Sequence, residues 1–188
     1  MASLPQTAIT AAEFEAMLER AGEQGRLIEL IDGEVIEKVV TELHGIIVLL
    51  LGYHLLKYRE DKPDIRVSTE VHHRAPDGGP NVYQPDIAVT LLTNALPVQD
   101  RGAVPRMPDL AIEVWSPTNS LVSLRKKAEY YLAHGTQMVW IVNPKKRLID
   151  VYRAGADVEI LTDTDTLDGG DLLPGFSLSV AALFDSVR

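Results

Sequence analysis

Apolar residues recur along this chain with two different spacings, and the way the spacings alternate predicts a mixed α/β fold. A spacing of three or four residues, typical of a helix with one buried face, follows the capping signal at residues 10–13 and returns over residues 41–58 and 121–134. Short runs rich in Val, Ile and Leu predict strands at residues 26–31, 34–40, 65–74, 84–90, 107–114, 138–142 and 147–153. A last short helix is expected near residues 180–184.

The connections between these segments predict how the sheet is assembled. Asp32-Gly33 tolerates positive φ, which suits a two-residue hairpin turn between the first two strands. The turn signal at residues 76–80 predicts a meander of the strand before it and the strand that carries Asp86. A strand, a helix and a hairpin follow. We therefore predict a mixed α/β sheet with helices on its faces, in one domain over residues 1–188.

Two of the predicted strands each carry one carboxylate among apolar neighbours, Asp86 and Glu113. A buried carboxylate costs free energy unless a partner compensates its charge, so both residues need a reason to be there. If the two strands are neighbours, the carboxylates lie about 4.8 Å apart across the sheet and can hold one hard divalent cation. Asp109 also follows a proline, but it lies about 13 Å from Glu113 along the same strand, too far to share an ion.

A lysine beside two such carboxylates would complete a hydrolytic site, because it can position a water molecule or stabilise developing negative charge. In the helix predicted over residues 121–134, the buried stripe consists of Leu124, Ala128, Tyr131 and Leu132. At about 100° per residue, Lys127 lies on the flank of this stripe and Lys126 points away from it. We predict that Lys127 reaches the carboxylates and that Lys126 is solvated.

The composition narrows the classes of function. Among the 188 residues there is no Cys, which excludes disulfides, a thiolate metal site and a Cys nucleophile. No apolar run approaches the ~20 residues that cross a bilayer and no secretory signal is recognisable, so we expect a cytoplasmic protein without membrane contact. The net charge of −9 argues against a broad phosphate-binding surface. Any contact with nucleic acid therefore has to be local, at a small basic cluster such as residues 125–127 or residues 145–147. The alternative for most of these six side chains is that they are solvated on a helix and a turn.

Residues 93–106 show no clear spacing and contain Pro97, Gly102 and Pro105. Such a stretch is typical of a surface loop. We predict that it is mobile and lies beside the candidate site, where it would act as a lid or a substrate guide.

In this order, the motifs resemble the PD-(D/E)XK nuclease superfamily, in the variant whose lysine has moved from the Glu strand to the following helix. More narrowly, the chain resembles the Uma-type family of restriction endonucleases. The matching pieces are residues 27–34, His44, residues 84–86, residues 112–117, Lys127 with Tyr131 and Gly135, Trp140, residues 151–153 and residues 173–176. The resemblance implies a restriction-endonuclease-like fold, a Mg²⁺ or Mn²⁺ ion at Asp86 and Glu113, and hydrolysis of nucleic-acid phosphodiesters, with DNA as the expected substrate. A homodimer would suit paired cleavage of a duplex.

The family positions also give Glu29 and His44 accessory roles, beside the alternative that both are ordinary structural residues. Two positions depart from the family pattern. Ser123 stands where an Asp commonly precedes the lysine by one helical turn, and Met138 stands where a Glu commonly precedes the strand Trp. Without that Asp, Lys127 has one orienting partner fewer. A second hypothesis therefore stays open: a non-catalytic module of the same fold that self-associates or binds nucleic acid or a protein partner.

Overall fold

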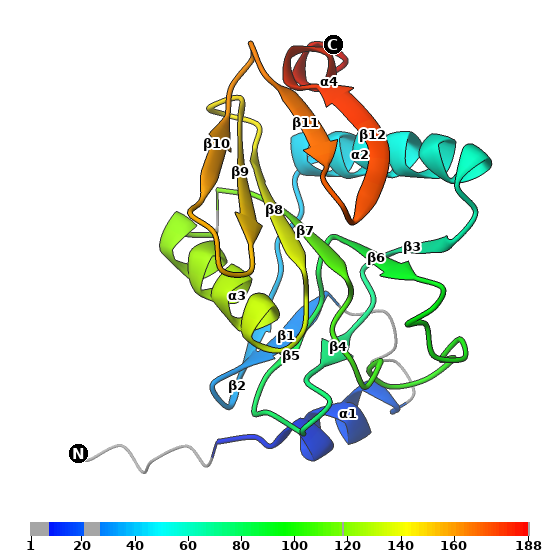
Figure 1. Ribbon diagram of the computed structural model, residues 1–188. Helices are drawn as coiled ribbons and strands as arrows, with labels where there is room; N and C mark the ends of the chain where they lie inside the picture. Colours follow the sequence, from blue (N-terminus) through cyan, green and yellow to red (C-terminus); the bar gives the residue numbers. More distant parts are fainter. Residues whose placement is uncertain (1–7, 21–26, 118, 188) are drawn as a thin grey trace.

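A six-stranded sheet forms the centre of the protein in the computed structural model, which describes residues 8–20, 27–117 and 119–187 (Figure 1). Its strands are β3 (Ile65–Thr69), β6 (Ile87–Leu91), β7 (Leu110–Val114), β8 (Met138–Asn143), β9 (Leu148–Arg153) and β10 (Glu159–Leu161). They lie in the order β10-β9-β8-β7-β6-β3, with β7 parallel to β8 and the other neighbouring pairs antiparallel. The predicted mixed sheet, including the hairpin from β8 into β9, is confirmed.

Helices cover both faces of this sheet (Figure 1). They are α2 (Glu42–Asp61) and α4 (Val180–Asp185) on one face and α3 (Leu121–Ala133) on the other, whereas α1 (Ala11–Leu18) lies on a second, smaller sheet. Side chains alternate between the two faces along β7: Ile112 is buried in the cluster that contains α2 and α4, whereas Ala111 is buried in the cluster that contains α3. Glu113 has the same parity as Ala111, and it therefore faces α3.

A smaller, four-stranded sheet lies beside the first, in the order β2-β1-β5-β4 (Figure 1). Its strands are β1 (Ile28–Ile31), β2 (Glu34–Glu37), β4 (His73–Arg74) and β5 (Val82–Tyr83). The predicted hairpin between β1 and β2 is confirmed, because Asp32 and Gly33 have φ values of 51° and 84°. Residue 26, where we expected the first strand to begin, lies outside the described residues. The helix α1, which has its predicted capping box, packs on this sheet through Phe14.

The segment predicted as one strand over residues 65–74 is divided between the two sheets, so the prediction of one unbroken strand is wrong. Its first part, β3, pairs antiparallel with β6, as the predicted meander requires. β3 ends at Thr69, and Glu70 adopts a left-handed conformation with a φ of 53°. A residue with a left-handed backbone cannot continue an extended strand. The chain therefore leaves the large sheet and enters the smaller one at His73. It returns through β5 to β6, which pairs directly with β3. The bend places the Glu70 carboxylate at the junction of the two sheets.

The buried face of α2 also differs from the prediction. The buried residues are His44, Ile47, Leu51 and Leu55. The apolar spacing over residues 41–58 predicts a different buried stripe, of Leu43, Ile46, Ile47, Leu50 and Leu55. Leu43 is instead 40% exposed, and Leu50 is half-buried. The helix carries apolar residues nearly all round, so the spacing alone does not set its rotation. Contacts with the sheet select the stripe that contains His44.

The C-terminal part of the chain contains strands that the pattern did not predict. β11 (Thr166–Gly169) and β12 (Leu173–Ser179) form a two-stranded sheet that leads into α4. Leu167 and Leu178 are buried in the same cluster as Trp140 of β8. The tail covers the central sheet and ends in the short helix that was expected near residues 180–184.

Residues 93–106 lack regular structure as predicted, but hydrogen bonds hold both ends of the segment. The guanidinium of Arg66 donates to Leu96 O at 2.8 Å, and the Arg74 N–H donates to Val104 O at 3.0 Å. The segment therefore has a defined position beside β3 and β4. The mobility that we predicted for it stays a prediction.

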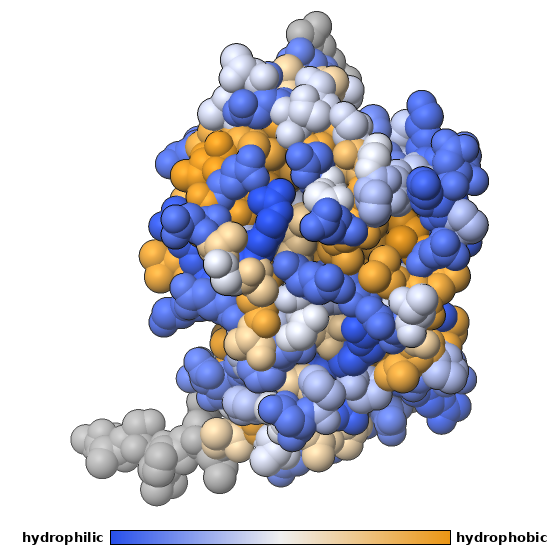
Figure 2. Space-filling view, in the orientation of Figure 1, coloured by the Kyte–Doolittle hydropathy of each residue, from blue (hydrophilic) through white to orange (hydrophobic). Residues whose placement is uncertain are grey.

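Apolar side chains are exposed in several places, two of which are the edge of the large sheet and the outer side of α2. Figure 2 shows one as an orange area over the β9–β10 edge of the large sheet, where Ile160 of β10 is 54% exposed. The other is the outer side of α2, with Leu49 73% exposed and Tyr53 56% exposed. Within the described ranges, none of the helices is long and apolar enough to cross a membrane.

Candidate active site

The strand register brings Asp86 and Glu113 together. Asp86 directly precedes β6, whose first residue Ile87 pairs with Ile112 of β7. Asp86 therefore lies opposite Glu113, and its Oδ2 accepts a hydrogen bond of 2.6 Å from the Val114 N–H. Only 1% of Asp86 and 2% of Glu113 is exposed. Two buried carboxylates thus lie on neighbouring strands, as the sequence predicts.

Lys127 reaches these carboxylates from α3. Its Nζ lies 2.8 Å from Glu113 Oε1, and the Tyr131 hydroxyl donates to the same oxygen at 2.9 Å. Lys127 is 6% exposed, whereas Lys126 is exposed to solvent. Since neighbouring helix residues point about 100° apart, only one of the two lysines can face the sheet. The predicted rotation of this helix is confirmed.

Glu29 and His44 lie in the same cluster. Glu29 is buried on β1, where its Oε1 lies 2.7 Å from Lys127 Nζ and accepts a hydrogen bond of 2.6 Å from the Gln84 N–H. His44 is at the start of α2, and its Nε2 lies 2.9 Å from Asp86 Oδ2. The structure therefore brings together all five residues singled out from the sequence, from five separate parts of the chain.

Two further residues belong to the cluster and were missed. Lys38, which follows β2, places its Nζ 2.7 Å from Asp86 Oδ1, 2.7 Å from Glu70 Oε2 and 2.8 Å from Gln84 O. Glu70 could have been found by the criterion that identified Asp86, because it is also a single acid inside a predicted strand. For Lys38 the signal was its place between Ile36 and two valines, where a lysine is unusual unless its charge is paired.

The charges of this cluster shift the pKa values of its members. Burial raises the pKa of Glu113 to about 7, although the Lys127 ammonium acts in the opposite direction. Burial also acts to raise the pKa of Asp86, but the hydrogen bond from His44 and the charge of Lys38 outweigh it and hold that pKa well below its usual range. For Lys127, the effect of burial is outweighed by the neighbouring carboxylates, Glu113 first, which keep its pKa above its usual value. Two carboxylates with pKa values shifted apart are typical of active sites.

The cluster has the right atoms for a divalent cation, although they are engaged with protein donors. Carboxylate and carbonyl oxygens are the ligands that Mg²⁺ and Mn²⁺ prefer. In the described part of the chain, however, no three acidic or His side chains already converge as a ready-made metal site. The Asp86 oxygens accept hydrogen bonds from Lys38, His44 and Val114 N–H. The donor chemistry therefore fits a cation, and Lys38 provides a positive charge in its place.

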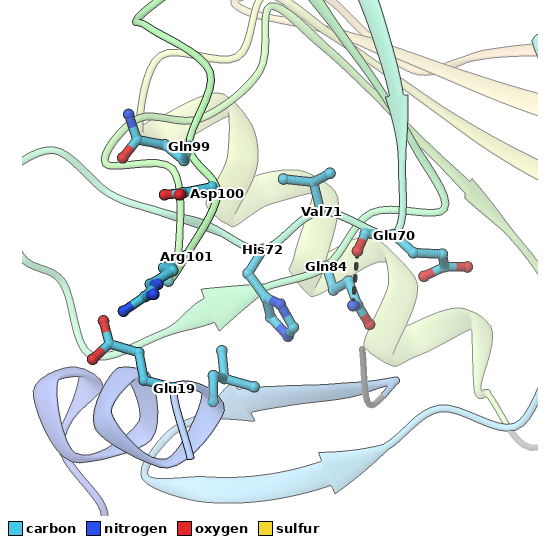
Figure 3. Close-up of a pocket in the computed structure, with 10 residues that line it drawn as sticks. Glu19, Glu70, Val71, His72, Gln84, Gln99, Asp100 and Arg101 are labelled. Carbon is cyan, nitrogen blue, oxygen red and sulfur yellow. Dashed lines mark hydrogen bonds between the residues drawn. The ribbon is translucent and has the colours of Figure 1, made fainter. Parts of the chain in front are cut away.

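A cavity of about 430 Å³ borders the cluster, between α1, the smaller sheet and residues 99–102. Glu70 and Gln84 lie at its edge, and a hydrogen bond of 2.9 Å from Gln84 Nε2 to Glu70 O joins them (Figure 3). The Glu70 side chain points away from Asp100 and Arg101 at the other end of the cavity (Figure 3). Residues 99–102 of the loop that was predicted to lie beside the site do line this cavity. Glu70 lies between the cavity and the cluster, because it lines the cavity and pairs with Lys38.

The two departures from the family pattern are accommodated locally. Ser123 lies in the first turn of α3, where its N–H donates to the Ser120 hydroxyl at 3.0 Å. The Met138 sulfur accepts a hydrogen bond of 3.0 Å from the Trp140 indole. The Lys127 ammonium has two carboxylate partners, Glu29 and Glu113, and it is therefore oriented without an Asp at position 123.

A mixed sheet with an Asp at the start of one strand, a Glu in its neighbour and a Lys on the next helix defines the restriction-endonuclease-like class of fold. Residues 11–181 match the Uma2 family, described as "Putative restriction endonuclease", and the chain belongs to this family.

One solved structure supports the same fold. A crystal structure of "a putative nuclease belonging to DUF820 from Anabaena variabilis ATCC 29413" has a TM-score of 0.83 and 23% identity, over 96% of this chain and 99% of that chain. A cryo-electron microscopy structure of a "DrdV-DNA complex" matches with a TM-score of 0.33 and 15% identity, over 78% of this chain and 92% of that chain, too low to inform either fold or function. Proteins of curated function give no significant match.

Proposed function

We propose that this protein is a divalent-metal-dependent endonuclease that hydrolyses phosphodiester bonds in nucleic acid, with Asp86 and Glu113 as ligands of Mg²⁺ or Mn²⁺. The observation that carries the proposal is the ion pair of 2.8 Å between Lys127 and Glu113, buried next to Asp86. An isolated structural ion pair would not need a second buried acid beside it. Membership of the Uma2 family supports the same reaction.

In this mechanism, a bound metal ion would polarise a phosphoryl oxygen and lower the pKa of a water molecule. Hydrolysis forms a bond from the water oxygen to phosphorus and breaks a bond from phosphorus to a sugar oxygen, which leaves with a proton. The Lys127 ammonium would donate hydrogen bonds to the attacking water or to the phosphoryl oxygen that gains negative charge. Glu29 and Tyr131 contribute by fixing the positions of Lys127 and Glu113.

The proposed substrate is DNA, bound through a small contact surface. A net charge of −9 argues against an extensive interface with phosphates. Arg125 and Lys126 are exposed on α3, next to Lys127 in sequence, and are available for local phosphate contacts. We further propose a cytoplasmic protein that acts as a homodimer, with the exposed apolar side chains of α2, such as Leu49 and Tyr53, as the candidate subunit interface.

The alternative is a non-catalytic module of the same fold that self-associates or binds nucleic acid or a protein partner. One observation favours it: the oxygens that would bind a metal ion already hold the Lys38 ammonium. A structural ionic cluster would have this character.

A nuclease assay separates the two functions. Single- and double-stranded DNA and RNA are incubated with wild type and with Glu113→Gln, in Mg²⁺, in Mn²⁺ and in excess chelator, at matched thermal stability. We expect metal-dependent cleavage by wild type and none by the variant, since Gln keeps the shape of Glu but not its charge. Equal cleavage by both proteins, or cleavage in chelator, contradicts the mechanism. No cleavage by either protein favours the non-catalytic module.

A further inference from the structure

The environment of Lys38 is built like a cation site. Its ammonium lies within 2.8 Å of three oxygens, from the carboxylates of Asp86 and Glu70 and the carbonyl of Gln84. Carboxylate and carbonyl oxygens also make up typical sites for hard divalent cations. The side chain of Lys38 is only 8% exposed, so its charge depends on these three partners.

We propose that Lys38 is the resident cation of this site, and that a divalent ion binding at Asp86 displaces its ammonium. This inference rests on the proposed metal-dependent function and adds a residue that controls it. Lys38 keeps the Asp86 carboxylate compensated and ordered while no metal ion is bound. It also lowers the affinity of the site for a metal ion, because each binding event has to break the ion pair of 2.7 Å with Asp86.

The geometry provides the ammonium with a place to go. Of its two carboxylate partners, Asp86 has a side chain that is 2% exposed and Glu70 has one that is 27% exposed. A lysine has four rotatable bonds, so the ammonium can leave Asp86 and remain paired with Glu70 nearer to solvent. Two cations a few ångströms apart repel strongly in a buried site, and the metal ion and the ammonium therefore exclude each other at Asp86.

Lys127 does not have this freedom, so the two buried lysines have different roles. Its ammonium lies between Glu29 and Glu113, whose side chains are 6% and 2% exposed. Among the described residues, Lys127 has no ion-pair partner near the surface comparable to Glu70. Lys127 stays in place when a metal ion binds, and Lys38 moves.

The test measures metal affinity directly. Mn²⁺ is titrated into wild type, Lys38→Met and the control Lys126→Met by calorimetry, and the melting temperature of each protein is recorded at several Mn²⁺ concentrations. We expect Lys38→Met to bind Mn²⁺ at least about tenfold more tightly than wild type, because a competing buried charge is gone. Its melting temperature should also rise more steeply with Mn²⁺. Lys126→Met removes the same charge from an exposed position of α3 and should match wild type.

Each other outcome is informative. Equal or weaker Mn²⁺ binding by Lys38→Met, with normal binding by wild type, overturns the role of Lys38 and leaves the proposed nuclease function standing. The absence of Mn²⁺ binding in all three proteins overturns both. If Lys38→Met does not fold without metal, Lys38→Gln replaces it, because Gln keeps a hydrogen-bond donor for Asp86 without the charge. The same gain in affinity is then expected.

Discussion

The dipeptide Pro-Asp precedes two inner strands of the large sheet, at Pro85-Asp86 and Pro108-Asp109, and the structure gives these two aspartates different surroundings. Each is 1% exposed. The Asp109 carboxylate accepts hydrogen bonds from the Leu91 N–H at 2.8 Å, from the Asn94 and Gln137 amides at 2.9 and 3.2 Å, and from the Arg106 guanidinium at 3.2 Å. Asp86 instead lies among three other carboxylates and two lysines.

The difference distinguishes a structural carboxylate from a candidate catalytic one. The Asp109 carboxylate accepts hydrogen bonds from four donors, of which three are neutral. These hydrogen bonds connect β6, the loop that follows β6 and the segment before β8. The surroundings of Asp109 give it no reason to exchange partners. Glu113, next to Asp86, has a pKa raised by burial to about 7, so keeping this carboxylate ionised at neutral pH lowers the stability of the folded protein. A cost of this kind persists where function requires it.

The largest expected effect concerns activity and comes from matched substitutions at the two aspartates. Asp86→Asn removes a proposed metal ligand and should lower cleavage by about a thousandfold or more. Asp109→Asn changes the same atoms outside the site and should leave cleavage within severalfold of wild type. Cleavage rates in Mg²⁺ and Mn²⁺ measure both. A similar loss in both variants, at matched folded fraction, would remove the distinction between the two carboxylates.

The second expected effect is on stability, and here Asp109→Asn should cause the larger loss. In Asp109→Asn, one carboxylate oxygen becomes an NH₂ group, which cannot accept the hydrogen bonds that four donors now give to Asp109. The substitution should therefore lower the free energy of unfolding by about 3–4 kcal/mol. For Asp86→Asn we expect a smaller loss, because Lys38 retains Glu70 and the Gln84 carbonyl. Urea denaturation of both variants gives the comparison. A larger loss at Asp86 would mean that the cluster is mainly structural.

The third effect is a pH dependence in the region around Asp109. His73 contacts Arg106 O through Nδ1 at 2.9 Å, and burial lowers the pKa of His73 from 6.5 to about 4. Between these pH values the unfolded chain binds more protons than the folded one, so the free energy of unfolding falls as the pH falls. For His73 the loss is at most about 3 kcal/mol. We expect His73→Gln to be less sensitive to acid over pH 4–6.5 in urea titrations. An unchanged pH profile would show that His73 does not contribute.

The sequence predicted the parts of this molecule in which one spacing dominates. The central strands, the α3 rotation that selects Lys127 over Lys126, and the pairing of Asp86 with Glu113 follow from the alternation of apolar residues and from short connections. Prediction failed where the backbone departs from a regular spacing or where a spacing is ambiguous. The positive φ of Glu70 divides a predicted strand, and the apolar residues on most sides of α2 conceal its phase.

Lys38 and Glu70 were missed for a related reason. Both enter the site from the junction of the two sheets, which depends on long-range packing that no local pattern encodes. A rule that treats every charged residue inside a predicted strand as a candidate would have included both. The same rule would also have included Asp109, which only the structure identifies as structural.

The smallest expected effect tests whether Lys127 is already fully oriented. Ser123→Asp restores the acid that the family commonly has one turn before the lysine. Near the helix start a carboxylate interacts favourably with the backbone N–H groups, so the free energy of unfolding should rise by about 0.5 kcal/mol. Because Glu29 and Glu113 already hold Lys127 at 2.7 and 2.8 Å, cleavage should change by less than about twofold. Thermal melts and cleavage rates measure the two effects. A gain of tenfold or more would mean that Glu29 does not orient Lys127 and that the native site lacks a partner at position 123.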